Sequence, residues 1–350
     1  MTKTYLRPLS LCYGTDAEHL IAQRRAGRLG GSGSIGFTAA ERIMRSAQGT
    51  QRDILSFSDF VDSEALGLIE ASRGEFAGLT LDAPKVMGIV NVTPDSFSDG
   101  GQHATFEAGL AHGLSLASEG ADILDVGGES TRPGSNAVPV DEELARVIPV
   151  VQRLSAAGHV VSIDTRKAPI MREAVKAGAA IINDVSALQF DPESLRTVAE
   201  LGCPIILMHA QGDPRTMQLN PHYDDVALDV YDHLEQRVEA CMAAGIVRSR
   251  IAIDPGIGFG KSFHHNLELL NQITLFHGLG VALLLGLSRK SLVGALTGEK
   301  LAKDRVHGSV GGAVQAALNG VHILRVHDVK PTVQALAVAM AVAKPHSTEF

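Results

Sequence analysis

Between Lys85 and the C-terminus, short apolar runs alternate with longer stretches of helical periodicity. The runs are mostly apolar at both odd and even positions. This pattern is typical of parallel strands that helices cover on both faces. The eight predicted strands are Val86–Val92, Ile123–Val126, Val160–Asp164, Ala180–Val185, Ile205–Met208, Ile251–Asp254, Val281–Leu287 and Ile323–Val326.

The stretches between the runs carry apolar stripes at helical spacing, and a last helix is predicted over Pro331–Ala343. The two clearest stripes are Leu144, Val147, Ile148, Val151 and Leu154, and Val226, Val230, Leu234, Val238 and Cys241. Eight strands that are each followed by a helix close into a barrel. We therefore predict an α/β fold, a (β/α)8 TIM barrel over residues 85–345.

A doubly wound open sheet is the competing architecture. It usually has fewer strands, and its first strand leads into a glycine fingerprint that binds a dinucleotide. Gly127 and Gly128 follow the second predicted strand and do not form such a fingerprint.

Residues 1–84 lack this rhythm and form an N-terminal extension whose role the sequence does not reveal. Thr38 followed by Glu41 fits a capping box, so a short helix is predicted over Thr38–Ser46. The basic cluster Arg24, Arg25 and Arg28 is interpreted as a solvated face rather than an anion site.

Composition narrows the class of protein. The formal net charge of −8 argues against broad nucleic-acid binding, which needs positive charge to neutralise phosphates. Cys12, Cys203 and Cys241 are too few and too widely spaced for a disulfide framework or a zinc site. No apolar run reaches the roughly 18–20 residues of a membrane span, and the N-terminus is too polar for a signal peptide. We expect a cytoplasmic protein without nucleic-acid or membrane partners.

Polar residues stand at the ends of most predicted strands, where a βα barrel carries its chemistry. A single Asn or Asp after a strand is usually a helix cap or a turn residue. Six such positions in one barrel are harder to explain in this way, because buried polar groups need partners. The six are Asn91, Asp164, Asn183, Asp254, Lys290 and Arg325.

These side chains divide by chemistry. Asp164, Asn183 and Asp254 suit a flat heterocycle, because a carboxylate accepts two parallel N–H bonds from an amidine-like edge. Arg132, Arg325 and His327 suit a phosphate or pyrophosphate. Asn91 offers an oxygen ligand for Mg²⁺, which commonly accompanies pyrophosphate. Ser291 begins a predicted short helix over Lys290–Leu296, whose N-terminus is suited to a small carboxylate.

The strings around these positions resemble the motifs of the dihydropteroate synthase family over about residues 85–343. Two of them are similar to its long active-site loops: Met87-Gly-Ile-Val-Asn-Val-Thr-Pro-Asp-Ser-Phe-Ser-Asp-Gly-Gly101 and Gly127-Gly-Glu-Ser-Thr-Arg-Pro-Gly134. Three more are similar to later motifs: Asp254-Pro-Gly-Ile-Gly-Phe-Gly-Lys261, Ser288-Arg-Lys-Ser291 and Arg325-Val-His-Asp328. The one small departure is Ile257, an apolar change.

The resemblance implies a transferase of folate synthesis that is a sulfonamide target. It condenses 6-hydroxymethyl-7,8-dihydropterin pyrophosphate with 4-aminobenzoate, giving 7,8-dihydropteroate and pyrophosphate. It also implies Mg²⁺ as cofactor and a homodimer.

The resemblance further implies a role for each matching residue. The implied pterin-binding residues are Asp164, Asn183, Val185, Met208, Asp254, Phe259 and Lys290. The implied pyrophosphate residues are Arg132, Arg325 and His327, and the implied Mg²⁺ ligand is Asn91. The residues implied around 4-aminobenzoate are Phe97, Thr131, Pro133, Lys290 and Ser291. Asp164, Asp254, Lys290, Arg132 and Arg325 are the expected catalytic residues.

An SN1-like order is expected, because pyrophosphate leaves readily once its charge is neutralised and an arylamine needs no strong base. Two alternatives stay open. A methyltransferase domain that binds methyl-tetrahydrofolate would share the Asp and Asn half of the site, but it has no need for the cationic half. A paralogue could bind pterin without catalysing the synthase reaction, and the N-terminal extension keeps this alternative open.

Overall fold

The computed structural model describes residues 2–92, 102–130, 137–212 and 216–344, and only the backbone of residues 102–105. Eight parallel strands form a closed barrel in the order β10-β11-β12-β13-β14-β7-β8-β9, which confirms the predicted fold. The strands are β7 (Lys85–Asn91), β8 (Ile123–Gly127), β9 (Val161–Asp164), β10 (Ile181–Asp184), β11 (Ile205–Met208), β12 (Ile251–Asp254), β13 (Ala282–Leu285) and β14 (Ile323–Val326).

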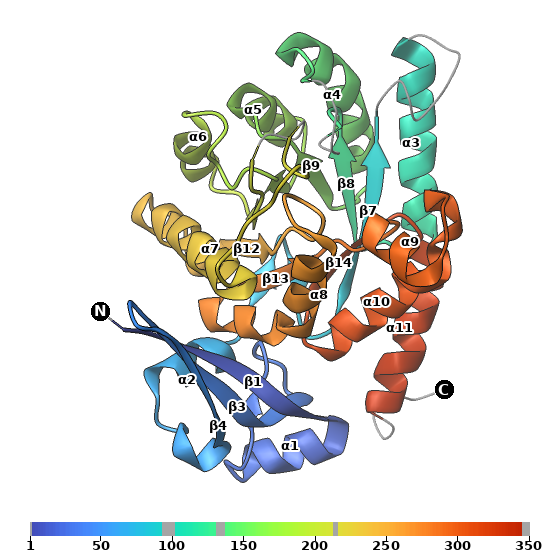
Figure 1. Ribbon diagram of the computed structural model, residues 1–350. Coiled ribbons are helices and arrows are strands. Elements are labelled where there is room, and N and C mark those ends of the chain that lie inside the picture. Colours follow the sequence, from blue (N-terminus) through green and yellow to red (C-terminus); the bar gives the residue numbers. More distant parts are fainter. Residues whose placement is uncertain (1, 93–101, 131–136, 213–215, 345–350) are drawn as a thin grey trace.

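Helices surround the barrel, as Figure 1 shows. They are α3 (Gln102–Ser118), α4 (Val140–Ala156), α5 (Ala168–Lys176), α6 (Ser194–Leu201), α7 (Val226–Ala243), α8 (Phe263–Asn271), α9 (Ser291–Thr297), α10 (Val306–Leu318) and α11 (Val329–Ala343). Three 3-10 helices join them: η3 (Arg248–Arg250), η4 (Ile273–Leu279) and η5 (Ala302–Asp304). No helix in the described ranges combines the length and the apolar run needed to cross a bilayer.

Each barrel strand divides its side chains between two cores, because successive residues of a strand point to opposite faces. Outward side chains such as Val126 and Ile253 pack with the helices in the larger core. Inward side chains nearer the N-terminal strand ends, here called the lower end of the barrel, form a separate apolar cluster. Its members are Met87, Ile123, Ile181, Ile206, Ala252, Ala282, Leu284 and Ile323. The residue two positions farther along a strand points to the same interior, one layer nearer the C-terminal strand ends.

The N-terminal residues form an antiparallel sheet with its own small core. Its central strand, β3 (Ile35–Ser46), pairs with β1 (Lys3–Tyr13) on one edge and with β2 (Gly27–Arg28) and β4 (Gly49–Ser56) on the other. The remaining elements are α1 (Gly14–Ala22), η1 (Phe57–Asp59), α2 (Glu64–Glu70), β5 (Glu75–Phe76) and β6 (Leu79–Thr80). Figure 1 shows this sheet in blue beside α7 and α8.

The helix predicted over Thr38–Ser46 is wrong, because this segment lies within strand β3. Phe37, Ala40 and Ile43 are buried at a spacing of three, which imitates one face of a helix. Pairing with β1 and β4 along nearly the whole segment overrides that local signal. Thr38 donates its hydroxyl to the carbonyl of Ser10 at 3.3 Å instead of capping a helix.

The basic cluster of the extension is solvated, as predicted: Arg24, Arg25 and Arg28 are exposed, and Arg24 pairs with Glu70 at 3.3 Å. Cys12 of the extension and Cys203 and Cys241 of the barrel are free thiols.

The short hairpin β5–β6 closes the lower end of the barrel. Phe76 at its tip is fully buried and packs against the inward apolar layer of the barrel strands. Farther out, Arg7 donates to the carbonyl of Asn271 at 2.8 Å, and Thr274 donates to the carbonyl of Pro8 at 2.8 Å. The extension is therefore continuous with the barrel in packing as well as in sequence.

Phe76→Ala should lower the free energy of unfolding by about 3–5 kcal/mol, because it leaves a cavity beneath the barrel. Urea denaturation of the full chain measures this loss. Ile54→Ala is the matched control, since Ile54 is 74% exposed on β4 and its truncation should cost less than about 0.5 kcal/mol. Equal stability of the two variants would contradict the role of Phe76 in closing the barrel.

Two buried histidines lie where the extension meets the barrel. His322 accepts from the backbone N–H of Leu283 at 3.0 Å and donates to the carbonyl of Gly30 at 3.1 Å, which requires the neutral ring. The His277 ring lies 5.7 Å away, and Arg73 donates to the His277 carbonyl at 3.0 Å. Burial, aided by the charge of Arg73, lowers the pKa of His322 to about 4.

This depressed pKa predicts acid lability. An unfolded His322 takes up its proton near pH 6.5, whereas the folded one resists protonation down to about pH 4. Its contribution is therefore complete above pH 6.5 and is lost as the pH falls toward 4, by about 3 kcal/mol. His322→Gln should flatten the unfolding free energy across this window by a similar amount. Identical pH slopes for the two proteins would rule out His322 as a source.

Candidate functional site

The C-terminal strand ends bring together charged side chains that point into the barrel. Asp164 ends β9 and Asp254 ends β12, while Asn183 lies one residue before the end of β10. Asp125 of β8 and Arg325 of β14 each stand two positions after an inward apolar residue, Ile123 and Ile323. The two-residue period of a strand therefore carries all five side chains into the same interior.

Arg325 connects three of these strands. Its Nε donates to Asp125 at 2.6 Å and its Nη2 donates to Asp164 at 2.8 Å. The amide of Asn183 donates to the same Asp125 oxygen at 3.1 Å. Asp125 is fully buried and Asp164 nearly so, so the guanidinium compensates two carboxylates that would otherwise be buried alone.

Burial and pairing act against each other on these groups. Burial raises the pKa of Asp164 to about 7, although Arg325 acts to lower it. Burial likewise acts to lower the pKa of Arg325, but the carboxylates of Asp125 and Asp164 outweigh it and raise that pKa above its usual value. The guanidinium therefore stays charged.

A second charged pair lies on the other side of the interior. Asp254 accepts from the backbone N–H of Gly256 at 2.7 Å, and burial raises the pKa of Asp254 although Lys290 opposes this. Lys290 donates to the Ile257 carbonyl, and its ammonium lies 4.7 Å from the centre of the Phe259 ring. Burial lowers the pKa of Lys290 to about 8, with Asp254 acting in the opposite direction.

Gly286 lies where Arg325 comes close to Asp254 and Lys290. A Cβ there would lie 3.8 Å from the Cβ of Arg325 and 3.9 Å from both Asp254 Oδ2 and Lys290 Nζ. The side chain of Arg325, the carboxylate of Asp254 and the ammonium of Lys290 therefore meet beside Gly286, directly after β13.

The loop from β12 to α8 is held by a buried lysine. Lys261 is 2% exposed, and its ammonium lies 2.8 Å from His209 Nδ1 and 3.0 Å from the Phe259 carbonyl. Burial, with the charge of Lys261, lowers the pKa of His209 to about 2, so the ring is a neutral acceptor. Gly256 has a φ of +71°, and a Cβ there would lie 1.9 Å from the His209 carbonyl, so this turn requires glycine.

A third cluster joins Glu129, which follows β8, to Val138, which precedes α4. Glu129 accepts from the backbone N–H of Val138 at 2.9 Å and from Arg166 at 3.1 Å. Lys167 donates to the Val138 carbonyl at 2.6 Å and to buried Glu143 at 2.6 Å. These bonds join residues on both sides of the segment 131–136.

Most predicted site residues lie at this end of the barrel. Val185 and Met208 follow or end neighbouring strands, and Phe259 lies beside Lys290. His327 follows β14 and lies 3.1 Å from Ser288 Oγ, and Ser291 is the exposed first residue of α9. Four predicted residues lie outside the described ranges: Phe97, Thr131, Arg132 and Pro133.

The predicted metal ligand Asn91 ends β7 beside Gly127 of β8, on the inward side set by Met87. Among the described residues, no group of three or more His, Cys, Asp or Glu side chains is arranged to hold a metal. Asp125, one layer lower on the neighbouring strand, has an oxygen, Oδ1, with no hydrogen-bond partner within the described part of the chain.

Sequence reasoning missed Asp125 and the Lys261–His209 pair as parts of the site. Asp125 could have been found from the two-residue period, because it stands two positions after Ile123 in a predicted strand. Nothing in the sequence indicated that Lys261 reaches His209, because 52 positions separate them along the chain.

Comparison with known proteins agrees with this geometry. Residues 87–327 match the family model described as pterin binding enzyme. The dihydropteroate synthase of Escherichia coli (strain K12) is 48% identical over 264 residues, which cover 75% of this chain and 93% of that protein.

Two solved structures are also similar. A Xanthomonas albilineans dihydropteroate synthase with 4-aminobenzoic acid has a TM-score of 0.73 and 55% identity, and covers 78% of this chain and 98% of its own. A Yersinia pestis dihydropteroate synthase with a sulfonamide drug complex has a TM-score of 0.72 and 47% identity, with coverage of 75% and 96%.

Arg325→Ala should lower the free energy of unfolding by about 3–5 kcal/mol, because it leaves Asp125 and Asp164 buried without a cation. Chemical denaturation at pH 8 measures the loss. Arg196→Ala serves as the control, since Arg196 is 66% exposed and pairs with Glu193 and Glu200 in its own helix region, so about 0.5 kcal/mol is expected there. A loss below about 1 kcal/mol for Arg325→Ala would show that the carboxylates do not depend on it.

Proposed function

The chain belongs to the pterin binding enzyme family, and we propose that it catalyses the dihydropteroate synthase reaction. In that reaction 6-hydroxymethyl-7,8-dihydropterin pyrophosphate and 4-aminobenzoate give 7,8-dihydropteroate and pyrophosphate. The observation that carries the proposal is the set of Asp164, Asn183, Asp254, Lys290 and Arg325 at one end of a barrel, and two relatives are 48% and 55% identical to this chain over the aligned residues.

We assign the pterin to the carboxylate side of this set. Asp254 is buried, and one of its oxygens already accepts from Gly256, so the other is available to the amidine-like edge of the ring. Asn183 supplies an amide, and Val185, Met208 and Phe259 supply apolar contacts to the ring faces. The Lys290 ammonium lies beside Phe259 and the Ile257 carbonyl, and we assign it as the donor to the carbonyl of the pterin ring.

We assign the pyrophosphate to Arg325 and His327, together with Arg132. Arg325 uses Nε and Nη2 to hold Asp125 and Asp164, and Nη1 carries two further donors. The position of 4-aminobenzoate follows from Lys290 and Ser291 at the start of α9, with Phe97, Thr131 and Pro133 as the assigned contacts from the two loops.

Mg²⁺ fits the residues present. Asn91 offers an amide oxygen, and the second oxygen of Asp125 is buried nearby on the adjacent strand. Mg²⁺ needs only one or two protein oxygens, because it keeps several waters. When bound, the ion would neutralise part of the pyrophosphate charge.

The chemistry assigned to the side chains follows from charge. The methylene C–O bond breaks, and the electron pair leaves with pyrophosphate, whose charge Arg325, His327 and Arg132 stabilise. Positive charge then spreads over the methylene carbon and the pterin ring, where the carboxylates of Asp164 and Asp254 face it. The arylamine lone pair forms the new C–N bond, and its nitrogen loses a proton to solvent or pyrophosphate. No strong base is required.

The proposal extends to assembly and location. Val338 and Val342 lie one turn apart on α11 and are 67% and 75% exposed, and exposed apolar patches of this kind often mark protein interfaces. We therefore propose a homodimer that uses this face. The free thiols Cys12, Cys203 and Cys241 are consistent with a reducing compartment, and we propose the cytoplasm.

The test is an assay of pyrophosphate release. Release should require the pterin pyrophosphate, accelerate with 4-aminobenzoate and match the 7,8-dihydropteroate formed, and a sulfonamide should compete with 4-aminobenzoate. Asp254→Ala should weaken binding of 6-hydroxymethyl-7,8-dihydropterin about 100-fold in calorimetry, because the charge-assisted hydrogen bonding of the ring to a buried carboxylate is lost.

Asp16→Ala, an exposed change on α1, should bind the pterin like the unaltered protein. Pterin binding without any condensation product would indicate a pterin-binding paralogue instead of a synthase. Unchanged pterin affinity in Asp254→Ala would refute the assignment of that residue.

A further inference from the structure

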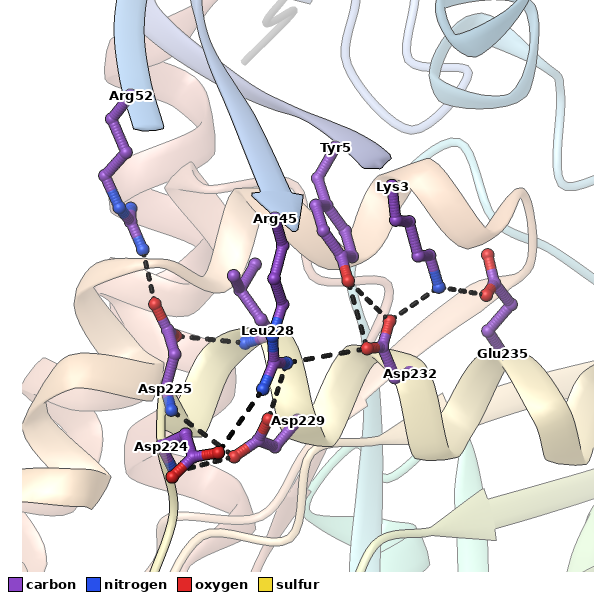
Figure 2. Close-up of polar contacts among 10 residues, drawn as sticks. All are labelled: Lys3, Tyr5, Arg45, Arg52, Asp224, Asp225, Leu228, Asp229, Asp232 and Glu235. Atoms are coloured by element: carbon purple, nitrogen blue, oxygen red, sulfur yellow. Dashed lines mark hydrogen bonds and ion pairs between the residues drawn. The ribbon is translucent and has the colours of Figure 1, made fainter. Parts of the chain in front are cut away.

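The start of helix α7 is strongly acidic and faces the N-terminal sheet. The five acidic residues, here called the acidic start of α7, are Asp224, Asp225, Asp229, Asp232 and Glu235. Figure 2 shows the side chains that meet them from β1, β3 and β4, which are Lys3, Tyr5, Arg45 and Arg52. Like charges so close on one helix repel each other unless cations lie between them.

The contacts are direct and numerous. Arg45 Nη1 lies 2.6 Å from Asp229 and 3.6 Å from Asp232, and its Nη2 lies 3.9 Å from Asp224. Arg52 Nη2 lies 2.6 Å from Asp225.

Nearer the N-terminus, Lys3 pairs with Asp232 at 2.5 Å and with Glu235, and the Tyr5 hydroxyl donates to Asp232 at 2.9 Å. Most of these side chains are only about a quarter to a third exposed, so solvent screens the network less than it screens an isolated surface pair.

Two of the carboxylates also build the helix start. Asp225 is the N-cap of α7 and accepts from the backbone N–H of Leu228 at 3.2 Å. Asp229 reaches back and accepts from the backbone N–H groups of Asp224 at 3.0 Å and Asp225 at 3.3 Å. In each carboxylate one oxygen bonds the helix start and the other bonds an arginine of the sheet. Arg52 and Arg45 therefore fix the carboxylates of Asp225 and Asp229, and these carboxylates stabilise the first turn of α7.

The residues just before α7 contact the candidate site. Within this lead-in segment, residues 216–225, the Tyr223 hydroxyl donates to the Gly260 carbonyl at 2.8 Å, and the Gln218 amide donates to the Gly258 carbonyl. The Tyr223 ring also lies 6.1 Å from that of His209. Gly258 and Gly260 flank Phe259 in the loop that follows Asp254, so the lead-in segment supports the loop assigned to the pterin.

We propose that the N-terminal sheet is a brace for the lead-in segment, and that Arg45 and Arg52 are positioning residues for the pterin side of the site. The expected change in substrate KM rests on the proposed function. Moving the segment would shift Tyr223 and Gln218 and loosen the Gly258–Gly260 turn beside Asp254 and Lys290. Apart from Lys290, the contacts assigned to 4-aminobenzoate lie on other loops and on α9, so they should be affected less.

The test compares two full-length variants. Arg45→Ala/Arg52→Ala removes both arginine contacts to the acidic start of α7. Arg42→Ala is the matched control, because Arg42 lies on the same strand and pairs with Asp53 inside the sheet. Each protein is assayed for kcat, for the two substrate KM values and for binding of 6-hydroxymethyl-7,8-dihydropterin. Hydrogen exchange is followed at the backbone amides of the whole chain, including residues 216–225.

The double variant should raise KM for the pterin pyrophosphate about tenfold, with KM for 4-aminobenzoate changed less than about twofold. Amide exchange should accelerate in the lead-in segment and at the start of α7. Arg45→Lys/Arg52→Lys should recover part of the pterin KM, because it restores the charge without the planar fork. Arg42→Ala should match the unaltered protein in every measurement.

Three outcomes count against the brace. It is overturned if the double variant keeps both the pterin KM and the exchange rates of the unaltered protein. It is also overturned if exchange rises evenly across the barrel and both KM values shift together, because the arginines then act on global stability alone. Faster local exchange with unchanged binding of 6-hydroxymethyl-7,8-dihydropterin would overturn the link to the site. An unaltered protein that lacks synthase activity refutes the proposed function instead, and exchange and pterin binding still decide the brace.

Discussion

Arg325 lies across the upper interior of the barrel, and its guanidinium holds Asp125 and Asp164 from two other strands. Two carboxylates in a protein interior carry a desolvation cost of several kcal/mol each, which only a well-placed cation offsets. The apolar layer beneath them offers no polar side chain that could take the place of the cation. Asn183 shares one of the same carboxylate oxygens, so the pairing joins side chains from four strands, β14, β8, β9 and β10.

The same constraint gives the site its proposed chemistry. A guanidinium that holds two carboxylates also presents donors to an anion, so one residue joins the proposed pyrophosphate side to the proposed pterin side. Asp254 and Lys290 add a second carboxylate and an ammonium beside Gly286, and burial lowers the pKa of that ammonium to about 8. Charges held in advance by neighbouring strands need little reorganisation when positive charge develops on a substrate, and this is the main physical advantage of such a site.

Ion pairs connect the N-terminal extension to the part of the barrel near the candidate site. Apolar packing connects it to the opposite, lower end of the barrel. Phe76 fills the lower end of the barrel, whereas Arg45 and Arg52 reach the beginning of α7, next to the residues that support the Gly258–Gly260 turn. The N-terminal extension therefore contacts both the apolar core of the barrel and the residues around the candidate site. The acidic start of α7 is the part of the barrel whose charge complements the basic side chains of the N-terminal sheet.

The sequence by itself determined the barrel and most of its polar strand ends, because the apolar runs of parallel strands and the two-residue period are local properties. It could not determine that residues 38–46 form a strand, since Phe37, Ala40 and Ile43 imitate a helix and only pairing with β1 and β4 decides otherwise. It also could not reveal the bonds of Lys261 to His209 or of Arg45 to Asp229, which are 52 and 184 positions apart. Contacts of this kind depend on how the chain closes, so only the tertiary structure decides them.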